Sequence, residues 1–163
     1  MSMVIDGTNG LTFNNATTQN SGSKVLQVVN ATYSTQTSST TNTYVDTGLT
    51  ATITPLFSTS KILVTVFLNG LVKTTNATYF KFKLVRGATD ILQYESVAGS
   101  TGSSADNAIG TSGAEYADSP ATTSATTYKV QFASNGNLAT AYVQYAVSSL
   151  PSTSTITLME IAA

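Results

Sequence analysis

The longest apolar run in the chain, residues 60–73 (SKILVTVFLNGLVK), constrains the fold more than any other stretch. A period-two pattern divides it into two faces, one with Ile62, Val64, Val66 and Leu68 and the other with Leu63, Thr65, Phe67 and Asn69. This pattern, rich in β-branched residues, predicts a β-strand. A helix is the alternative for a short apolar run, but consecutive Val64, Thr65 and Val66 and the closing Gly70 favour the strand. Because both faces are largely apolar, we expect a central strand with one face in a sandwich core and part of the other against a second surface.

The composition supports an all-β class. Only 9% of the 163 residues are charged, so the helix formers Glu, Lys and Arg are scarce. The abundant Thr suits strands, while Ser and Asn suit turns. A chain rich in Ser and Thr can also be disordered, but 41% apolar residues and regular strand patterns argue against disorder.

Several functional classes lack the residues that they require. The chain has 0 Cys and 0 His, which removes disulfides, thiolate metal sites and the commonest general base and metal ligand. Its 7 Lys and Arg residues are scattered, so no basic patch for nucleic acid is expected. No apolar run approaches the roughly 18 residues of a membrane span. We therefore expect no cofactor, no metal, no nucleic-acid partner and no membrane partner.

Strands and turns are predicted along most of the chain. Before the central strand we expect strands at 24–35, 44–45 and 48–54, and after it a hairpin over 78–97. Residues 99–118 are predicted to form a long loop. Residues 123–133 and 138–147 are expected to pair across an Asn135-Gly136 turn, and 155–161 forms the last strand.

These connections give about eight main antiparallel strands, which favours a two-sheet β-sandwich of the jelly-roll type. An immunoglobulin-like sandwich is the runner-up, but the chain lacks the Cys pair and the Trp of the antibody branch. We assign residues 24–163 to the jelly-roll domain.

The first 23 residues differ from the rest of the chain. They alternate short β-prone pieces with Asp-Gly, Asn-Gly and Asn-Asn turn signals and have too few apolar residues for a core of their own. We expect residues 1–23 to be an attachment arm that becomes ordered against another chain by strand addition, with a frayed terminus as the alternative. The residues expected to make the contact are Val4, Ile5, Leu11 and Phe13.

Three segments together resemble structural proteins of bacteriophages. They are IDGTNGLTFNNATTQ near the N-terminus, SKILVTVFLNG in the centre and TITLMEI at the end. The first is similar to short segments of tail fibres and related appendages, and the other two are similar to strands that follow in many of these proteins. The resemblance implies a trimeric jelly-roll head, similar to the tumour-necrosis-factor and C1q architecture, with the closing strands near the threefold axis.

Residue chemistry independently favours a homotrimer. Strands 138–147 and 155–161 carry apolar residues on both faces, and such strands need a second surface that an oligomer axis provides. An ordinary sandwich with an exposed Tyr or two is the alternative. In a trimer, Glu160 would lie close to the axis or at the end of the molecule, where three converging carboxylates raise one another's pKa or attract a cation. The candidate interface residues are Tyr142, Gln144, Met159, Glu160 and Ile161.

Two kinds of ligand chemistry are weighed on the predicted loop at 99–118. Asp106, Glu115 and Asp118 would provide carboxylates for glycoside hydrolysis or for Ca²⁺, although solvated loop carboxylates are the simpler explanation. A sugar-binding ring is the other candidate, with Tyr116 preferred over Tyr94 and Tyr128 because it falls in this loop. Packing at a subunit contact is the alternative for these rings.

The sequence therefore predicts a non-enzymatic protein of the virion exterior. Its first version is a trimeric short fibre or fibre-tip module that contacts the host, with a surface glycan as a candidate partner, and is held to other virion proteins by the arm. Its second version is a trimeric capsid decoration (cement) protein that stabilises the shell, which the short chain without a shaft favours. A carbohydrate-active tail enzyme is a remote third version.

Overall fold

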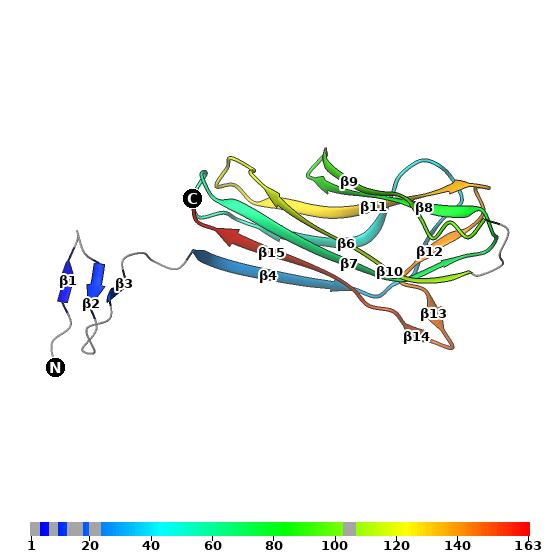
Figure 1. The fold of residues 1–163 in the computed structure, drawn as a ribbon, viewed down its shortest axis with the longest axis horizontal. Helices are drawn as coiled ribbons and strands as arrows, with labels where there is room; N and C mark the ends of the chain where they lie inside the picture. Colours follow the sequence, from blue (N-terminus) through cyan, green and yellow to red (C-terminus); the bar gives the residue numbers. More distant parts are fainter. Residues whose placement is uncertain (1–3, 7–9, 13–17, 20–23, 103–106) are drawn as a thin grey trace.

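The computed structural model of the chain describes residues 4–6, 10–12, 18–19, 24–102 and 107–163. Strands, turns and loops make up these residues, and every strand pairing among them is antiparallel. Within the described ranges, no helix has the length and hydropathy to cross a membrane. The main body is an antiparallel β-sandwich (Figure 1), so the predicted all-β fold class is confirmed.

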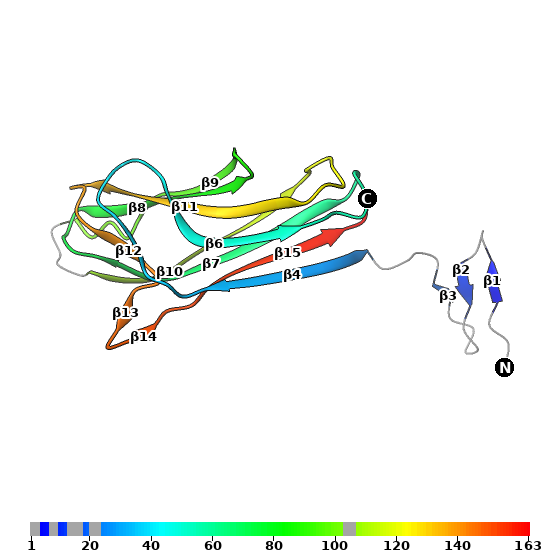
Figure 2. The same cartoon turned by 180° about the vertical axis from the view of Figure 1, so that it is seen from behind.

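Two sheets face each other in the sandwich, as Figures 1 and 2 show from opposite sides. We call them the β7 sheet and the β8 sheet. The β7 sheet contains β4 (Val25–Tyr33), β5 (Thr37–Ser39), β7 (Lys61–Lys73), β10 (Ala108–Asp118), β12 (Ala141–Val143) and β15 (Ser154–Ile161). The β8 sheet contains β6 (Val45–Ile53), β8 (Thr78–Arg86), β9 (Thr89–Ala98) and β11 (Thr126–Gly136).

The order of the eight long strands is that of a jelly roll. Neighbours run β4-β15-β7-β10 in one sheet and β6-β11-β8-β9 in the other. The first long strand therefore lies beside the last, and the second beside the seventh, which is the double Greek key of jelly-roll proteins.

The central position predicted for the apolar run is confirmed. One edge of β7 pairs with β10 from Ile62 to Val72, and the other edge pairs with β15 and then with β12. Its inward residues Ile62, Val64, Val66 and Leu68 are at most 1% exposed. Facing them in the core are Leu49, Ile53, Phe80, Phe82, Leu84, Tyr128, Val130 and Phe132, with Ile156 and Leu158 beside β7.

The predicted loop at 99–118 is wrong in its second half. Residues Ala108–Asp118 form β10, which pairs with β7 along most of its length. Ala, Gly and Ser dominate this segment, so it carries no apolar alternation of its own. It forms a strand because the long edge of β7 offers it a partner, a tertiary effect that strand propensity does not capture.

The predicted pairing of 123–133 with 138–147 is also wrong. Strand β11 pairs with β6 and β8, and it continues through Asn135 and Gly136, which lie opposite Tyr79 and Thr78. The segment that follows crosses to the β7 sheet, where β12 pairs with β5 and β7. A two-stranded hairpin of β13 (Ala146–Val147) and β14 (Leu150–Pro151) comes next. In contrast, the hairpin over 78–97 and the last strand are confirmed as β8–β9 and β15.

The N-terminal arm contains a small sheet of three short strands, β1 (Val4–Asp6), β2 (Gly10–Thr12) and β3 (Thr18–Gln19). Ile5 pairs with Leu11, and Leu11 pairs with Gln19. In Figure 1 this sheet stands beyond the start of β4, separate from the two sheets of the sandwich. Strands this short do not form a stable unit by themselves.

Candidate functional site

The outward face of the β7 sheet is the candidate site. Because side chains alternate along a strand, Leu63, Thr65 and Phe67 of β7 point away from the core while their neighbours point into it. The strand register aligns four apolar residues in one row across β4, β15, β7 and β10. The row contains Val28, Met159, Leu63 and Ala117. Val28 is 54% exposed, and Met159 and Leu63 are half-buried.

The next two rows of the same face are mostly uncharged. Asn30, Thr157, Thr65 and Glu115 form the second row, and Thr32, Thr155, Phe67 and Gly113 form the third. The ring of Phe67 is 50% exposed and lies close to Gly113, where a Cβ atom would approach the ring to 3.0 Å. Glu115 is the one charged residue in these three rows. The face therefore offers an apolar row and an exposed aromatic ring, with charges at Glu115 in the second row and at the exposed Lys61 beyond the other side of the apolar row.

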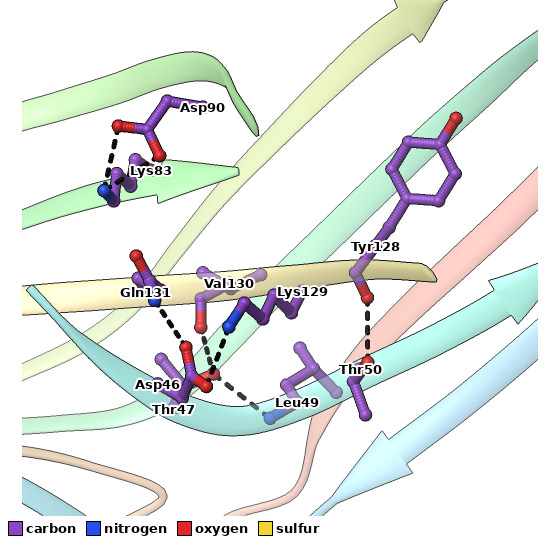
Figure 3. Close-up of polar contacts among 10 residues, drawn as sticks. All are labelled: Asp46, Thr47, Leu49, Thr50, Lys83, Asp90, Tyr128, Lys129, Val130 and Gln131. Carbon is purple, nitrogen blue, oxygen red and sulfur yellow. Dashed lines mark hydrogen bonds and ion pairs between the residues drawn. The ribbon is translucent and has the colours of Figure 1, made fainter. Parts of the chain in front are cut away.

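The outward face of the β8 sheet has the opposite character (Figure 3). The Nζ atom of Lys129 lies 2.9 Å from Asp46, and the amide of Gln131 donates to the same carboxylate at 2.6 Å. Lys83 and Asp90 form a second ion pair at 2.9 Å. Side chains of this kind remain hydrated at a solvent-facing surface.

Two lysines of the β8 sheet also contact an aromatic ring. The ammonium groups of Lys81 and Lys83 lie 5.0 and 4.4 Å from the centre of the Tyr44 ring. Cation–π contacts of this geometry fix the positions of charges at a surface. Contacts within this face thus hold its charged side chains in defined positions.

The predicted trimer-interface residues divide between the two sides of the β7 sheet. Met159 and Ile161 lie on the outward side, and Tyr142 is half-buried with its ring edge-on to Tyr145 at 5.2 Å. Gln144 and Glu160 are 0% exposed and lie inside the protomer. The amide of Gln144 donates to Oγ of Ser154 at 2.9 Å. Both side chains are enclosed in the protomer and so do not reach its surface, which the prediction required. Glu160 alternates with the outward-facing Met159 and Ile161, whereas Gln144 lies just beyond the end of β12.

Glu160 has a structural role at one end of the sandwich. Its Oε1 accepts hydrogen bonds from the backbone N–H groups of Leu56 at 2.8 Å and Phe57 at 3.4 Å, and its Oε2 accepts one from Gln27 at 2.5 Å. Burial alone would raise the pKa of this carboxyl, but the hydrogen bonds outweigh burial and lower the pKa below its ordinary value. In the single chain the carboxylate is thus enclosed by its own hydrogen-bond partners, and its pKa is lowered, not raised.

The candidate catalytic carboxylates do not form a pair. Asp118 points into the sandwich and is 5% exposed, whereas Glu115 is exposed on the outward side of the same strand. Three positions apart on a strand, these side chains face opposite sides of the sheet. Asp106 lies outside the described residues. Among the described residues, no group of three or more His, Cys, Asp and Glu is placed to hold a metal ion.

Asp118 instead joins the two sheets. Its carboxylate accepts hydrogen bonds from Nη1 of Arg86 at 2.8 and 2.7 Å and from the hydroxyl of Tyr128 at 2.7 Å. Burial raises the pKa of Tyr128, and its hydrogen bond to Asp118 raises it further. The hydrogen bonds from Arg86 to Asp118 raise the pKa of the guanidinium. This network is a clamp between β10 and the β8 sheet.

The placement of the tyrosines changes the case for sugar binding. Tyr116 lies within β10 and packs against the core, so the loop position that favoured it is wrong. Tyr128 is 0% exposed, and the ring of Tyr94 stacks on Phe82 at 5.7 Å. None of the three rings stands at the tip of a loop.

Sequence reasoning missed several residues of the outward face. Val28 and Ala117 were not singled out, and Leu63 and Phe67 were assigned only to the second face of the central strand. Their common face becomes apparent only when the register of the four strands is known. Of the arm residues, Val4, Ile5 and Leu11 lie in β1 and β2, and Phe13 lies outside the described residues.

Comparisons with known proteins add little to this site. No family model matches the chain, and no curated protein matches it. Among solved structures, the crystal structure of the infectious bursal disease virus VP2 subviral particle is similar, with a TM-score of 0.47 and 14% sequence identity. The match covers 90% of this chain and 43% of that chain, so this chain spans less than half of that protein. With a TM-score this low, the neighbour's name indicates nothing about the function of this chain.

Proposed function

We propose that this chain is a non-enzymatic structural protein on the exterior of a bacteriophage particle, where it acts as a homotrimer assembled through the outward face of the β7 sheet. Its first role is that of a short fibre or fibre-tip module for adhesion. Residues 1–23 attach it to other virion proteins. Such a protein functions in particle assembly and in contact with the host, and these functions require no catalytic group.

The apolar row is the observation that carries this proposal. Val28, Met159, Leu63 and Ala117 lie side by side on four different strands, so a flat partner covers all of them at once. Full burial of a Val, Leu or Met side chain contributes roughly 1.5–3 kcal/mol. A face with one charge in three rows also avoids most of the desolvation cost of an interface.

The resemblance to phage structural proteins supports the same surface. The SKILVTVFLNG segment begins at Ser60 and runs along most of β7, and TITLMEI is the greater part of β15. These two segments pair with each other, and Leu63 and Met159 lie opposite one another in that pairing. The motifs that resemble a trimeric family therefore supply the centre of the apolar row.

A charge placed in the row tests the proposal. We expect the unmodified chain to have the mass of a trimer by light scattering, and Val28→Glu to weaken association at least about 100-fold, because a carboxylate would be buried in the interface. Val97→Glu is the matched control, since Val97 lies in β9 of the other sheet and is 56% exposed against 54% for Val28. A monomeric unmodified chain, or equal effects of the two substitutions, contradicts the proposal.

The same trimer would serve a capsid decoration protein, and copy number separates the two roles. A decoration protein is present at a level comparable with the major capsid protein, whereas a fibre has far fewer copies in each particle. Quantitative mass spectrometry of purified particles measures this ratio. We expect the low ratio of a fibre, and a ratio near that of the capsid protein would assign the chain to the shell.

A further inference from the structure

A short hairpin leaves the β7 sheet between two segments that lie on the same edge of β7. Strand β15 pairs with β7 as far as Phe67, and β12 pairs with it again at Val72 and Lys73. Strand β10 occupies the opposite edge over this whole stretch. Residues 144–153, which include β13 and β14, are thus an insertion in an otherwise continuous line of pairing.

The base of the hairpin is held firmly. The N–H groups of Gln144 and Tyr145 donate to the carbonyl oxygens of Asn69 and Gly70 at 2.9 and 3.1 Å. Gly70 has a φ of +64°, and a Cβ atom there would lie 2.6 Å from Ser152 and from the nitrogen of Tyr145. Only glycine fits at this position, which indicates that the hairpin is seated closely on β7.

The tip of the hairpin is apolar and exposed. Val147 and Leu150 are paired across the turn, with exposed fractions of 65% and 75%. Ser148 and Ser149 form the turn with φ values of +50° and +67°, a region that Gly and Asn adopt more readily than Ser. The segment Ala146–Pro151 contains no charged residue. A two-stranded hairpin of this kind is marginal unless something covers it.

The direction of the hairpin identifies what covers it. In Figures 1 and 2, β13 and β14 extend from the β7 sheet on the side away from β8, β9 and β11. This is also the side to which Val28, Met159 and Phe67 point. A molecule packed on the outward face of the β7 sheet therefore meets the hairpin at its margin, and both surfaces are apolar and nearly uncharged.

We infer that the hairpin β13–β14 is an intersubunit clasp, whose tip, with Val147 and Leu150, packs against the outward face of the β7 sheet of a second copy of this chain. The inference rests on the proposed function, because it requires the chain to associate with itself. It adds a contact outside the apolar row, made by a segment that projects beyond its own sandwich. The uncharged tip matches the neutral face, whereas the ion pairs on the β8 sheet would have to lose water to receive it.

Removal of the apolar tip tests the clasp. We expect the double variant Val147→Ser/Leu150→Ser to weaken association about 100-fold in sedimentation velocity over a dilution series, roughly tenfold for each side chain. Val97→Ser/Leu138→Ser is the matched control, since it removes an exposed Val and Leu outside the β7 sheet and is expected to leave association unchanged. Circular dichroism is expected to show the same fold in all three proteins.

Cross-linking locates the contact. The chain has 0 Cys, so Leu150→Cys provides a single thiol for a benzophenone label. In a mixture of isotopically light and heavy protein, we expect light-to-heavy cross-links from position 150 to β4, β15, β7 or β10. Cross-links confined to single chains, or directed to the β8 sheet, would overturn the clasp.

The failure of the clasp differs from the failure of the proposed function. If the unmodified chain assembles and the hairpin variant assembles equally well, the clasp is overturned while the apolar row is retained. If the unmodified chain is a monomer at every concentration, both are overturned.

Discussion

The two outer faces of the sandwich differ in chemistry although they belong to the same jelly roll. On the β8 sheet, Asp46, Lys83, Asp90 and Lys129 form ion pairs among themselves. On the β7 sheet, the corresponding face presents Val28, Met159, Leu63 and Ala117 in one row. The ion pairs therefore lie on the β8 face, while the rows of the β7 face around Leu63 carry few charges and are suited to contact with protein.

The comparison also separates charges that support the fold from charges that cover a surface. Asp118 and Glu160 belong to strands of the β7 sheet but point inward, where they hold the two sheets and a loop in place. Asp46 and Asp90 belong to the β8 sheet and face water. We therefore expect the inward carboxylates to dominate stability and the outward ones to contribute little.

The largest effect is expected at Asp118. Asp118→Ala removes a carboxylate that accepts hydrogen bonds from both Arg86 and Tyr128, and it leaves those partners unpaired between the sheets. We expect a loss of about 3 kcal/mol in the free energy of unfolding, at the lower end for a broken buried pair because Arg86 is partly exposed. Urea unfolding at one fixed protein concentration measures it, since association also contributes to stability.

Asp90→Ala is the control for this prediction. It removes an aspartate from an ion pair whose carboxylate is 61% exposed, and it is expected to cost about 0.5 kcal/mol. Equal losses at Asp118 and Asp90 would break the distinction between inward and outward charges.

Glu160 is expected to have an intermediate effect that depends on pH. Because the pKa of this carboxyl is lowered in the folded protein, its contribution to stability is complete above the ordinary value of 4.5 and is lost as the pH falls through the lower, folded value. Glu160→Gln loses the charge and brings a second amide to Gln27. At neutral pH we expect it to cost about 2 kcal/mol, the size of one hydrogen bond to a charged group.

The pH profile distinguishes this role from an interface role. The difference in unfolding free energy between the unmodified chain and Glu160→Gln is expected to shrink as the pH falls below 4.5. A difference that stayed constant with pH, or a change in oligomer mass at high pH cured by Glu160→Gln, would restore this residue to the interface.

Much of the sandwich was predictable because β-branched and aromatic residues alternate clearly in β7, β8 and β15. Strand β10 was not, since its residues are mostly small and its strand conformation depends on the edge of β7. The predicted path of the chain after β11 was wrong because Asn135-Gly136, a strong turn signal, lies inside β11, where it pairs with β8. Local sequence predicts a strand well when the strand's own side chains form part of the core. It predicts a strand poorly when the strand forms because a neighbouring strand offers it a partner.

The site was predictable only in part, for a related reason. Alternation correctly separates Met159 and Ile161 from their neighbours, but it does not say which set faces the core. That assignment depends on which residues the second sheet covers, and Glu160 lies on the covered side. Val28, Leu63 and Ala117 join Met159 only through registers between strands far apart in the sequence.

The smallest effect is expected on the charged face itself. Lys129 pairs with Asp46, whose carboxylate is 54% exposed. A double-mutant cycle with Asp46→Ala and Lys129→Ala should give a coupling of about 0.5 kcal/mol at low salt, because water screens the pair. Raising the salt to about 1 M should remove most of that coupling. Neither substitution should change the oligomer mass, since this face is expected to stay in water while the β7 sheet is covered. A coupling of several kcal/mol, or dissociation of the oligomer, would mean that the charged face is the buried one and would reverse the roles assigned to the two sheets.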